Sequence, residues 1–217
     1  VHWDLRYADP PAFSHSFEIN ANPGLTPASP QGPLALPGTY TFKLTVDGKS
    51  YTQTASIAND PRSPATLEDL RAQHVLEMKA YDGARAAWDG YQAANATHAA
   101  VEKLAAGSGP AAVTAAAKAL AAKLDSASGG TGGGRGRGFG FGRGGGGAAP
   151  PNFRVVNGAM IRVLTTLEPG DMAPNPPMRA GYAAACEDLR TAANNWRAVV
   201  TKDLPAFNAT LKQNGMP

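Results

Sequence analysis

Cysteine is almost absent from this sequence, whose 217 residues contain one, Cys186. A single thiol excludes an intramolecular disulfide and any zinc site built from several cysteines. No stretch approaches 18 consecutive apolar residues, so the sequence predicts no transmembrane helix. No positively charged segment precedes an apolar run, so we expect no signal peptide within the sequence given.

Motifs of common enzymes are missing as well. No serine lies in a Gly-x-Ser-x-Gly elbow, and no Gly-x-x-x-x-Gly-Lys-Ser/Thr loop for phosphate occurs. The carboxylates of Glu68-Asp69 and Glu187-Asp188 are adjacent, and neighbours on a helix point in different directions. A glycosidase needs two carboxylates that face one bond. We therefore expect no catalytic residues in this chain.

The excess of positive charge belongs to one segment. The chain has 20 lysines and arginines against 17 aspartates and glutamates. Residues 129–149 contain three of the arginines and no acid, so the rest of the chain is balanced. A nucleic-acid groove needs basic residues clustered on one face. The balanced remainder therefore makes nucleic acid an unlikely partner for the folded part.

The first 58 residues carry the alternation of apolar and polar side chains that is typical of strands. It runs over residues 3–7, 40–46 and 51–57, with a shorter stretch at Phe17 and Ile19. Asp47-Gly48 lies between the last two runs and predicts a two-residue type I′ hairpin. About four strands are fewer than the seven of an immunoglobulin or fibronectin domain. We expect a partial β-sandwich of that kind, incomplete at its N-terminus, with an unpaired sheet edge.

Residues 59–65 are predicted to be a linker, and residues 66–217 an antiparallel helical bundle. Thr66 and Asp69 suit a capping box, and helical spacing continues to Gly107 and again over 110–127. A short helix is expected at about 203–213. Two further seams step by three and four residues: Phe153, Val156, Met160, Val163 and Leu167, and Tyr182, Cys186, Leu189, Ala193, Trp196 and Val200. The expected fold class is α+β.

A glycine-rich loop at 129–149 interrupts the predicted bundle. Arginines and phenylalanines are interleaved with glycines within it, as in RGG segments that bind single-stranded RNA. A flexible connector between two helices is the plainer interpretation. We expect the loop to contact a partner through Arg135, Arg137, Phe139, Phe141 and Arg143.

Several stretches together resemble a known family. They are residues 3–7 (WDLRY), 37–40 with 44–48 (PGTY and LTVDG), 60–62 (DPR) and 203–208 (DLPAFN). In this order they look like the C-terminal region of large bacterial proteins with BNR/Asp-box (sortilin-type) repeats, often labelled glycosyl hydrolases. The resemblance covers nearly the whole chain except residues 129–149.

The resemblance implies a secreted, periplasmic or cell-surface parent protein with an N-terminal β-propeller. It also implies that any hydrolase chemistry would lie in that propeller. No Asp-box motif occurs in these 217 residues. The chain itself is therefore expected not to be an enzyme, and its expected partners are the propeller region or other copies of the chain.

Two histidine–carboxylate pairs could suggest a metal site. His74 with Glu77, and His98 with Glu102, each share a helix face. A di-metal bundle needs Glu-x-x-His on two helices and two further glutamates, which the sequence lacks. Cys186 is expected to be a buried structural thiol. We therefore expect no metal and no cofactor.

The sequence thus favours a non-catalytic interaction and assembly module that contacts partners through a sheet edge and the glycine-rich loop. Two alternatives stay open. Carbohydrate could bind the aromatic residues Trp3, Tyr40, Tyr51 and Trp88 as an accessory domain. RNA could bind the glycine-rich loop.

Overall fold

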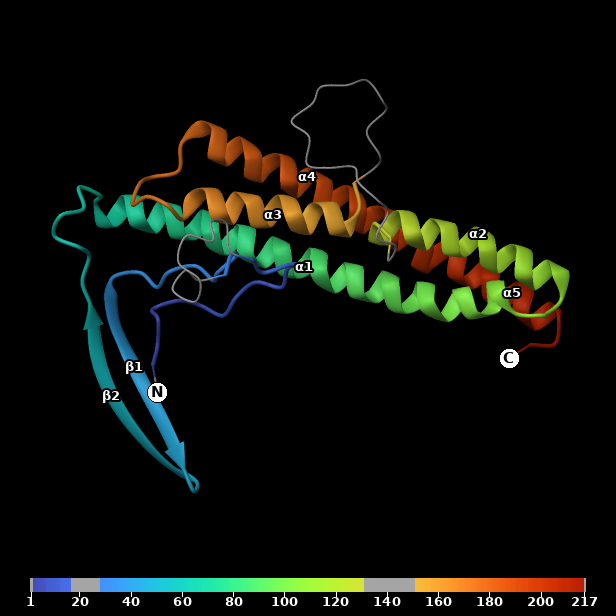
Figure 1. Cartoon of the computed structure of the whole chain (residues 1–217), viewed down its shortest axis with the longest axis horizontal. Helices are drawn as coiled ribbons and strands as arrows, with labels where there is room; N and C mark the ends of the chain where they lie inside the picture. The colour runs from blue at the N-terminus through green and yellow to red at the C-terminus, as the bar shows by residue number, and fades with distance from the viewer. Residues whose placement is uncertain (1, 17–27, 131–150, 217) are drawn as a thin grey trace. The chain divides into compact units, whose positions relative to one another are not determined.

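The chain has an α+β fold that divides into two compact units. The computed structural model in Figure 1 describes residues 2–16, 28–130 and 151–216. Unit 1 comprises Val1–Pro10, Ser14–Asp82 and Ile161–Tyr182, and unit 2 comprises Pro11–Phe13, Gly83–Met160 and Ala183–Pro217. Each unit is therefore assembled from segments that lie far apart in the sequence.

The sheet of unit 1 is one antiparallel hairpin. Strand β1 (Gly38–Val46) pairs with β2 (Lys49–Ile57), with Leu44 opposite Tyr51. Asp47 and Gly48 connect them with φ values of 49° and 76°. Positive φ at both turn positions is what a type I′ turn requires, so the predicted hairpin is confirmed.

The two faces of this hairpin differ in chemistry. Directly paired residues share a face, so Tyr40, Phe42, Leu44 and Val46 lie on one side with their partners Ala55, Gln53, Tyr51 and Lys49. The other side pairs Thr39 with Ser56, Thr41 with Thr54, Lys43 with Thr52 and Thr45 with Ser50. We call the first side the apolar hairpin face.

The prediction of about four strands is wrong for the part of residues 1–58 that the structure describes. Residues 3–7 form no strand, and only isolated bridges join Arg6 to Leu34 and Ser16 to Ser29. Leu5 has a φ of 64°, which lies in the left-handed region, whereas an extended strand needs a negative φ. The stretch at Phe17 and Ile19 lies outside the described residues.

The helices lie where the sequence spacing placed them. They are α1 (Leu67–Ala106), α2 (Ala111–Ser128), α3 (Phe153–Leu167), α4 (Pro176–Ala198) and α5 (Leu204–Gln213). Residues 59–65 between β2 and α1 have no helix or strand. The capping box before α1 is confirmed: Thr66 Oγ1 accepts from the Asp69 amide at 3.1 Å, and the Thr66 amide donates to Asp69 Oδ2 at 3.0 Å.

Unit 2 has a hydrophobic core formed by the end of α1, α2 and the C-terminal helical turns. Its fully or nearly buried members are Val101, Val113, Ala117, Leu120, Leu124, Val199, Phe207 and Leu211. On α2 they recur every three or four residues, which turns one stripe of the helix toward the core. The alanine-rich sequence of α2 therefore contributes a packed face, as its spacing predicted.

A π-helical turn, η1 (Val199–Asp203), joins α4 to α5 and was not expected. Its extra residue lets Val199 and Leu204, five apart, contact the same core cluster. The predicted seam residue Val200 is instead 41% exposed, while Val199 is 5% exposed. The predicted seam lies one residue too late from α4 into η1, because Ala185, Ala192 and Val199 are buried where Cys186, Ala193 and Val200 were expected.

Val199→Ala and Val200→Ala form a matched pair that tests this shift. Val199→Ala should lower the free energy of unfolding by about 2 kcal/mol, because it removes two buried methyl groups. Val200→Ala should change it by less than about 0.5 kcal/mol, as for most surface changes. Urea unfolding followed by circular dichroism measures both, and a larger loss for Val200→Ala would refute the register of η1.

Candidate functional site

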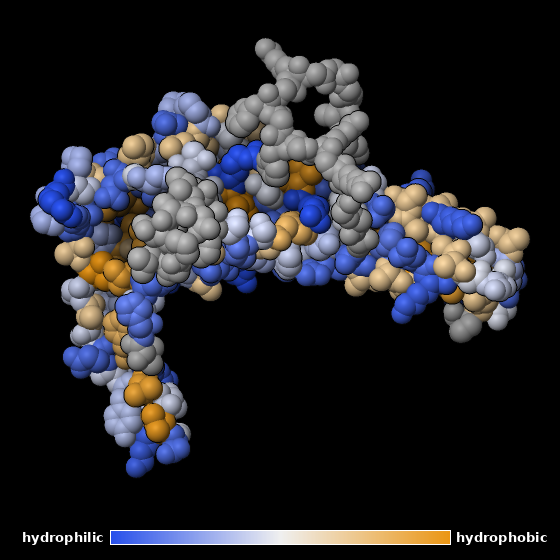
Figure 2. Space-filling model, viewed as in Figure 1, coloured by the Kyte–Doolittle hydropathy of each residue, from blue (hydrophilic) through white to orange (hydrophobic). Residues whose placement is uncertain are grey.

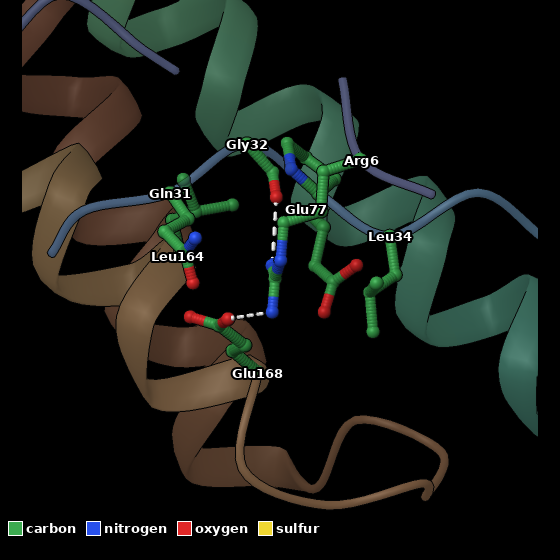
Figure 3. Close-up of a pocket in the computed structure, with 8 residues that line it drawn as sticks. Arg6, Gln31, Gly32, Leu34, Glu77, Leu164 and Glu168 are labelled. Carbon is green, nitrogen blue, oxygen red and sulfur yellow. Dashed lines mark hydrogen bonds and ion pairs between the residues drawn. The ribbon is translucent and has the colours of Figure 1, made fainter. Parts of the chain in front are cut away.

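A cluster of charged side chains lies inside unit 1, and we call Arg6, Glu77 and Glu168 the carboxylate cluster. Arg6 reaches Glu168 Oε1 with Nη2 at 2.5 Å and the carbonyl oxygen of Gly32 with Nη1 at 2.9 Å. Figure 3 shows Glu77 on the other side of the arginine, pointing toward the same space. Glu77 is 6% exposed. One arginine thus serves two carboxylates.

The sequence around Arg6 fixes its direction. The Arg6 amide donates to Asp4 Oδ1 at 3.0 Å, which closes a small turn at the positive-φ residue Leu5. The Tyr7 amide then donates to the Pro33 carbonyl at 3.0 Å. A Cβ on Gly32 would lie 2.1 Å from the Tyr7 carbonyl oxygen, so only glycine permits this close approach.

Gln73 holds the opposite wall of the cluster. It lies one turn before Glu77 on α1, and its Nε2 donates to Glu77 Oε1 at 3.0 Å and to the Leu167 carbonyl at 2.7 Å. Its Oε1 accepts from the Met172 amide at 3.2 Å. These three bonds satisfy the buried side-chain amide of Gln73. The bond to the Leu167 carbonyl also connects α1 to the end of α3.

Burial raises the pKa of the Glu77 carboxyl above its ordinary value. The hydrogen bond from Gln73 opposes this shift, the charge of Glu168 adds to it, and the charge of Arg6 opposes it. The space between these side chains is partly open to solvent, and its volume of about 10 Å³ gives room for about one water molecule. The cluster can bind a water or hold a proton, but it leaves no room for a sugar.

The histidine–carboxylate pairs take different positions. His74 stacks beside Tyr7 at 5.7 Å between ring centroids, and burial lowers the pKa of its imidazole while the Leu34 backbone opposes the shift. His98 lies between two carboxylates, with Nδ1 3.7 Å from Glu102 and Nε2 3.7 Å from Asp125. Within the described ranges, no three His, Cys, Asp or Glu side chains are grouped so that they could hold a metal ion.

The other sequence candidates take structural or surface positions. Asp69 caps α1, and Glu187 pairs with Arg190 one turn away on the exposed face of α4. Cys186 is half-buried on α4 and unpaired with another cysteine. The five glycine-rich-loop residues Arg135, Arg137, Phe139, Phe141 and Arg143 lie outside the described residues.

Of the four aromatic residues proposed for carbohydrate, Trp3, Tyr40 and Trp88 belong to tilted clusters, whereas Tyr51 is 60% exposed on the hairpin. The Trp3 ring meets Tyr40 at 61° and Phe42 at 68°. Trp88 lies 38° from Tyr91, and Phe13 packs against both of these rings. A flat platform for a sugar needs exposed, coplanar rings, and the described aromatic pairs do not provide one.

The apolar hairpin face exposes large side chains of a kind that folding normally buries. Phe42 is 43% exposed, Leu44 56%, Val46 48% and Tyr51 60%. Figure 2 shows hydrophobic residues at the surface along the hairpin. Each strand pairs only with the other among the described residues, so both outer edges keep unpaired backbone groups.

Comparison with known proteins adds no family to these observations. The chain matches no family model, no curated protein and no solved structure. The likeness to BNR-repeat proteins therefore stays a prediction from the sequence. None of the described helices is long and apolar enough to cross a membrane.

The sequence did not predict the carboxylate cluster. Glu77 was considered only as a possible metal ligand with His74, and Arg6 was predicted to lie in a strand. Arg6 and Glu168 are 162 positions apart, so no spacing rule could pair them. The one available signal was that a glutamate shares the helix face of Leu70 and Gln73, which is an unusual place for a charge.

Proposed function

We propose that this chain is a non-catalytic interaction and assembly module, and that the apolar hairpin face with its open edges is its contact surface. The observation that carries the proposal is the exposure of four large side chains on one face of a two-stranded sheet. A lone two-stranded hairpin is marginally stable in water, whereas three or more strands with an apolar face suffice. A partner that adds strands would meet this need.

A second copy of the chain can supply those strands. Antiparallel pairing of β1 with its copy about Phe42 sets Leu44 opposite Tyr40 and keeps all apolar side chains on one face. Lys43 then stands opposite Thr41, so no like charges meet. Pairing of β2 with its copy about Gln53 behaves in the same way. The strands carry none of the prolines that natural edge strands use to prevent such pairing.

The finer assignments belong to the same proposal. The hairpin would be part of an incomplete immunoglobulin- or fibronectin-like sandwich, and the helices would form an antiparallel bundle. The parent would be a secreted, periplasmic or cell-surface bacterial protein with the chemistry in a propeller, as the sequence resemblance implies. Carbohydrate and RNA binding remain alternatives, but no described contact favours either.

Leu44→Lys and Thr54→Lys test the proposal as a matched pair. Both place a lysine on an exposed strand position, one on the apolar hairpin face and one on the polar face. Leu44→Lys should weaken self-association at least about tenfold, or about 1.4 kcal/mol, because it puts a charge into the apolar contact. Thr54→Lys should leave it unchanged.

Light scattering on the native particle over a concentration series measures this effect. The unmodified chain should exceed its 22.3 kDa monomer mass as concentration rises. A monomer at every concentration would contradict pairing with a second copy. Equal weakening by both lysines would instead show that charge, and not the apolar face, governs association.

A further inference from the structure

A short N-terminal strap packs beside the buried carboxylate of Glu77. The strap is residues 3–10, of which Arg6 lines the space beside Glu77 together with residues 31–34 (Figure 3). Two described backbone hydrogen bonds join the strap to residues 31–35: Tyr7 amide to Pro33 carbonyl at 3.0 Å, and Ala35 amide to Leu5 carbonyl at 2.7 Å. Arg6 Nη1 also donates to the Gly32 carbonyl at 2.9 Å, and Asp9 Oδ1 accepts from the Gly32 amide at 3.2 Å. Closure of the strap can be followed at the Tyr7 and Ala35 amides.

The charges around Glu77 do not balance. Among the described residues, the strap contributes Arg6 and also Asp9, whose Oδ1 accepts from the Gly32 amide at 3.2 Å, and the residue after α3 contributes Glu168. Residues 31–35 contribute no ionisable side chain, and α1 contributes Gln73, which donates to Glu77, and His74, which stacks on Tyr7. When both carboxylates are ionised, the cluster holds two negative charges and one positive charge.

We propose that Glu77 is a proton-operated latch: the strap stays closed over a neutral Glu77 carboxyl and opens when that carboxyl ionises. An ionised carboxylate in this position needs water. The small, partly open space beside Glu77 accommodates about one molecule, and Glu77 is only 6% exposed, so fuller hydration of the carboxylate is favoured when the strap lifts. Arg6 moves with the strap, which leaves the open cluster to the solvent.

The direction of the pH dependence follows from burial. The pKa of Glu77 lies above its ordinary value of 4.5 in the closed form, because burial disfavours the charged carboxylate. A group whose pKa is raised in the closed form stabilises that form most at low pH. The stabilisation is lost as pH rises from about 4.5 to the raised value, because opening then releases a proton.

Opening of the strap would also change the exposure of the apolar hairpin face, a consequence that rests on the proposed function. Trp3 belongs to the strap, donates from Nε1 to the Arg6 carbonyl at 2.9 Å and packs on Tyr40 and Phe42. A lifted strap would uncover the root of the apolar hairpin face. Ionisation of Glu77 would thus make that face more accessible as pH rises, whereas protonation of His74, whose pKa burial lowers, acts in the opposite direction at acidic pH.

Hydrogen exchange at the Tyr7 and Ala35 amides tests the latch without reference to self-association. Protection factors, corrected for intrinsic exchange, should fall by up to about tenfold per pH unit within the titration window, since each opening releases one proton. Glu77→Gln should remove this dependence, because the amide keeps an acceptor for Gln73 but cannot ionise. Glu68→Gln, at an exposed position of the same helix, should behave like the unmodified chain.

Constant protection in the unmodified chain, or an unchanged pH dependence in Glu77→Gln, would overturn the proposal. If Glu77→Gln does not fold, the latch can still be tested on the unmodified chain. The carboxyl carbon resonance of Glu77 should titrate within the same pH interval in which the two amides lose protection. Separate intervals would overturn the latch, whereas a failure of self-association would leave it intact.

Discussion

Arg6→Ala is expected to destabilise unit 1 by about 2 kcal/mol, because it removes the partly buried ion pair and charge-assisted hydrogen bond to Glu168. The change removes the only positive charge that contacts Glu168 and that lies beside Glu77 among the described residues. It also removes the guanidinium bond to the Gly32 carbonyl. Two carboxylates would then face each other in a partly buried space.

Urea unfolding monitored by circular dichroism measures this loss, with Arg62→Ala as the control. Arg62 forms the same kind of pair with Asp60 at 2.7 Å, but its side chain is 89% exposed. Solvent screens such a pair, so Arg62→Ala should leave the unfolding midpoint unchanged. If the two variants lose the same stability, the carboxylate cluster is not a structural centre of unit 1.

Gly90→Ala and Gly158→Ala should change the stability of unit 2 in opposite directions. A Cβ on Gly90 would lie 2.5 Å from ring carbons of Phe153, which is 3% exposed and has little space to move. Overpacking of this kind costs about 1–3 kcal/mol. A Cβ on Gly158 meets nothing within 4 Å, so there the helix should gain up to about 1 kcal/mol.

Both glycines lie inside helices, so helix propensity alone predicts that both alanines stabilise. The melting temperatures of the two variants separate the effects. A stabilising Gly90→Ala would show that α1 and the start of α3 do not pack as closely as the structure places them. Gly83→Ala provides an intermediate case, because its Cβ would meet the flexible side chain of Met160 at 2.8 Å.

Local patterns were sufficient for the regular elements. The Asp47-Gly48 turn, the Thr66–Asp69 cap and the helical spacing of α1 to α3 depend on residues within a few positions of one another, and each is confirmed. Short-range sterics and hydrogen bonds decide such features before any tertiary contact forms. The strand predicted from the alternation at residues 3–7 is absent, because Leu5 has a positive φ and the Asp4 side chain closes a turn there.

The candidate site was much harder to predict. Glu77 is buried by the strap, by residues 31–35 and by Leu164 of α3, which come from three distant parts of the chain. No single-sequence pattern reports which segment will cover a helix face. The buried face at Val199 is similar, because Ala192-Ala193 and Val199-Val200 are pairs of identical residues and spacing alone does not say which member of each pair faces the core.

By itself, the sequence determined the hairpin with one apolar and one polar face, the helices and their boundaries, because period and turn chemistry are local properties. Only the tertiary structure decided that the apolar hairpin face remains exposed and that Glu77 does not. Exposure depends on which distant segments pack together, since burial is a property of the assembled units. The proposed contact surface and the proposed latch both depend on which side chains the tertiary structure exposes or buries.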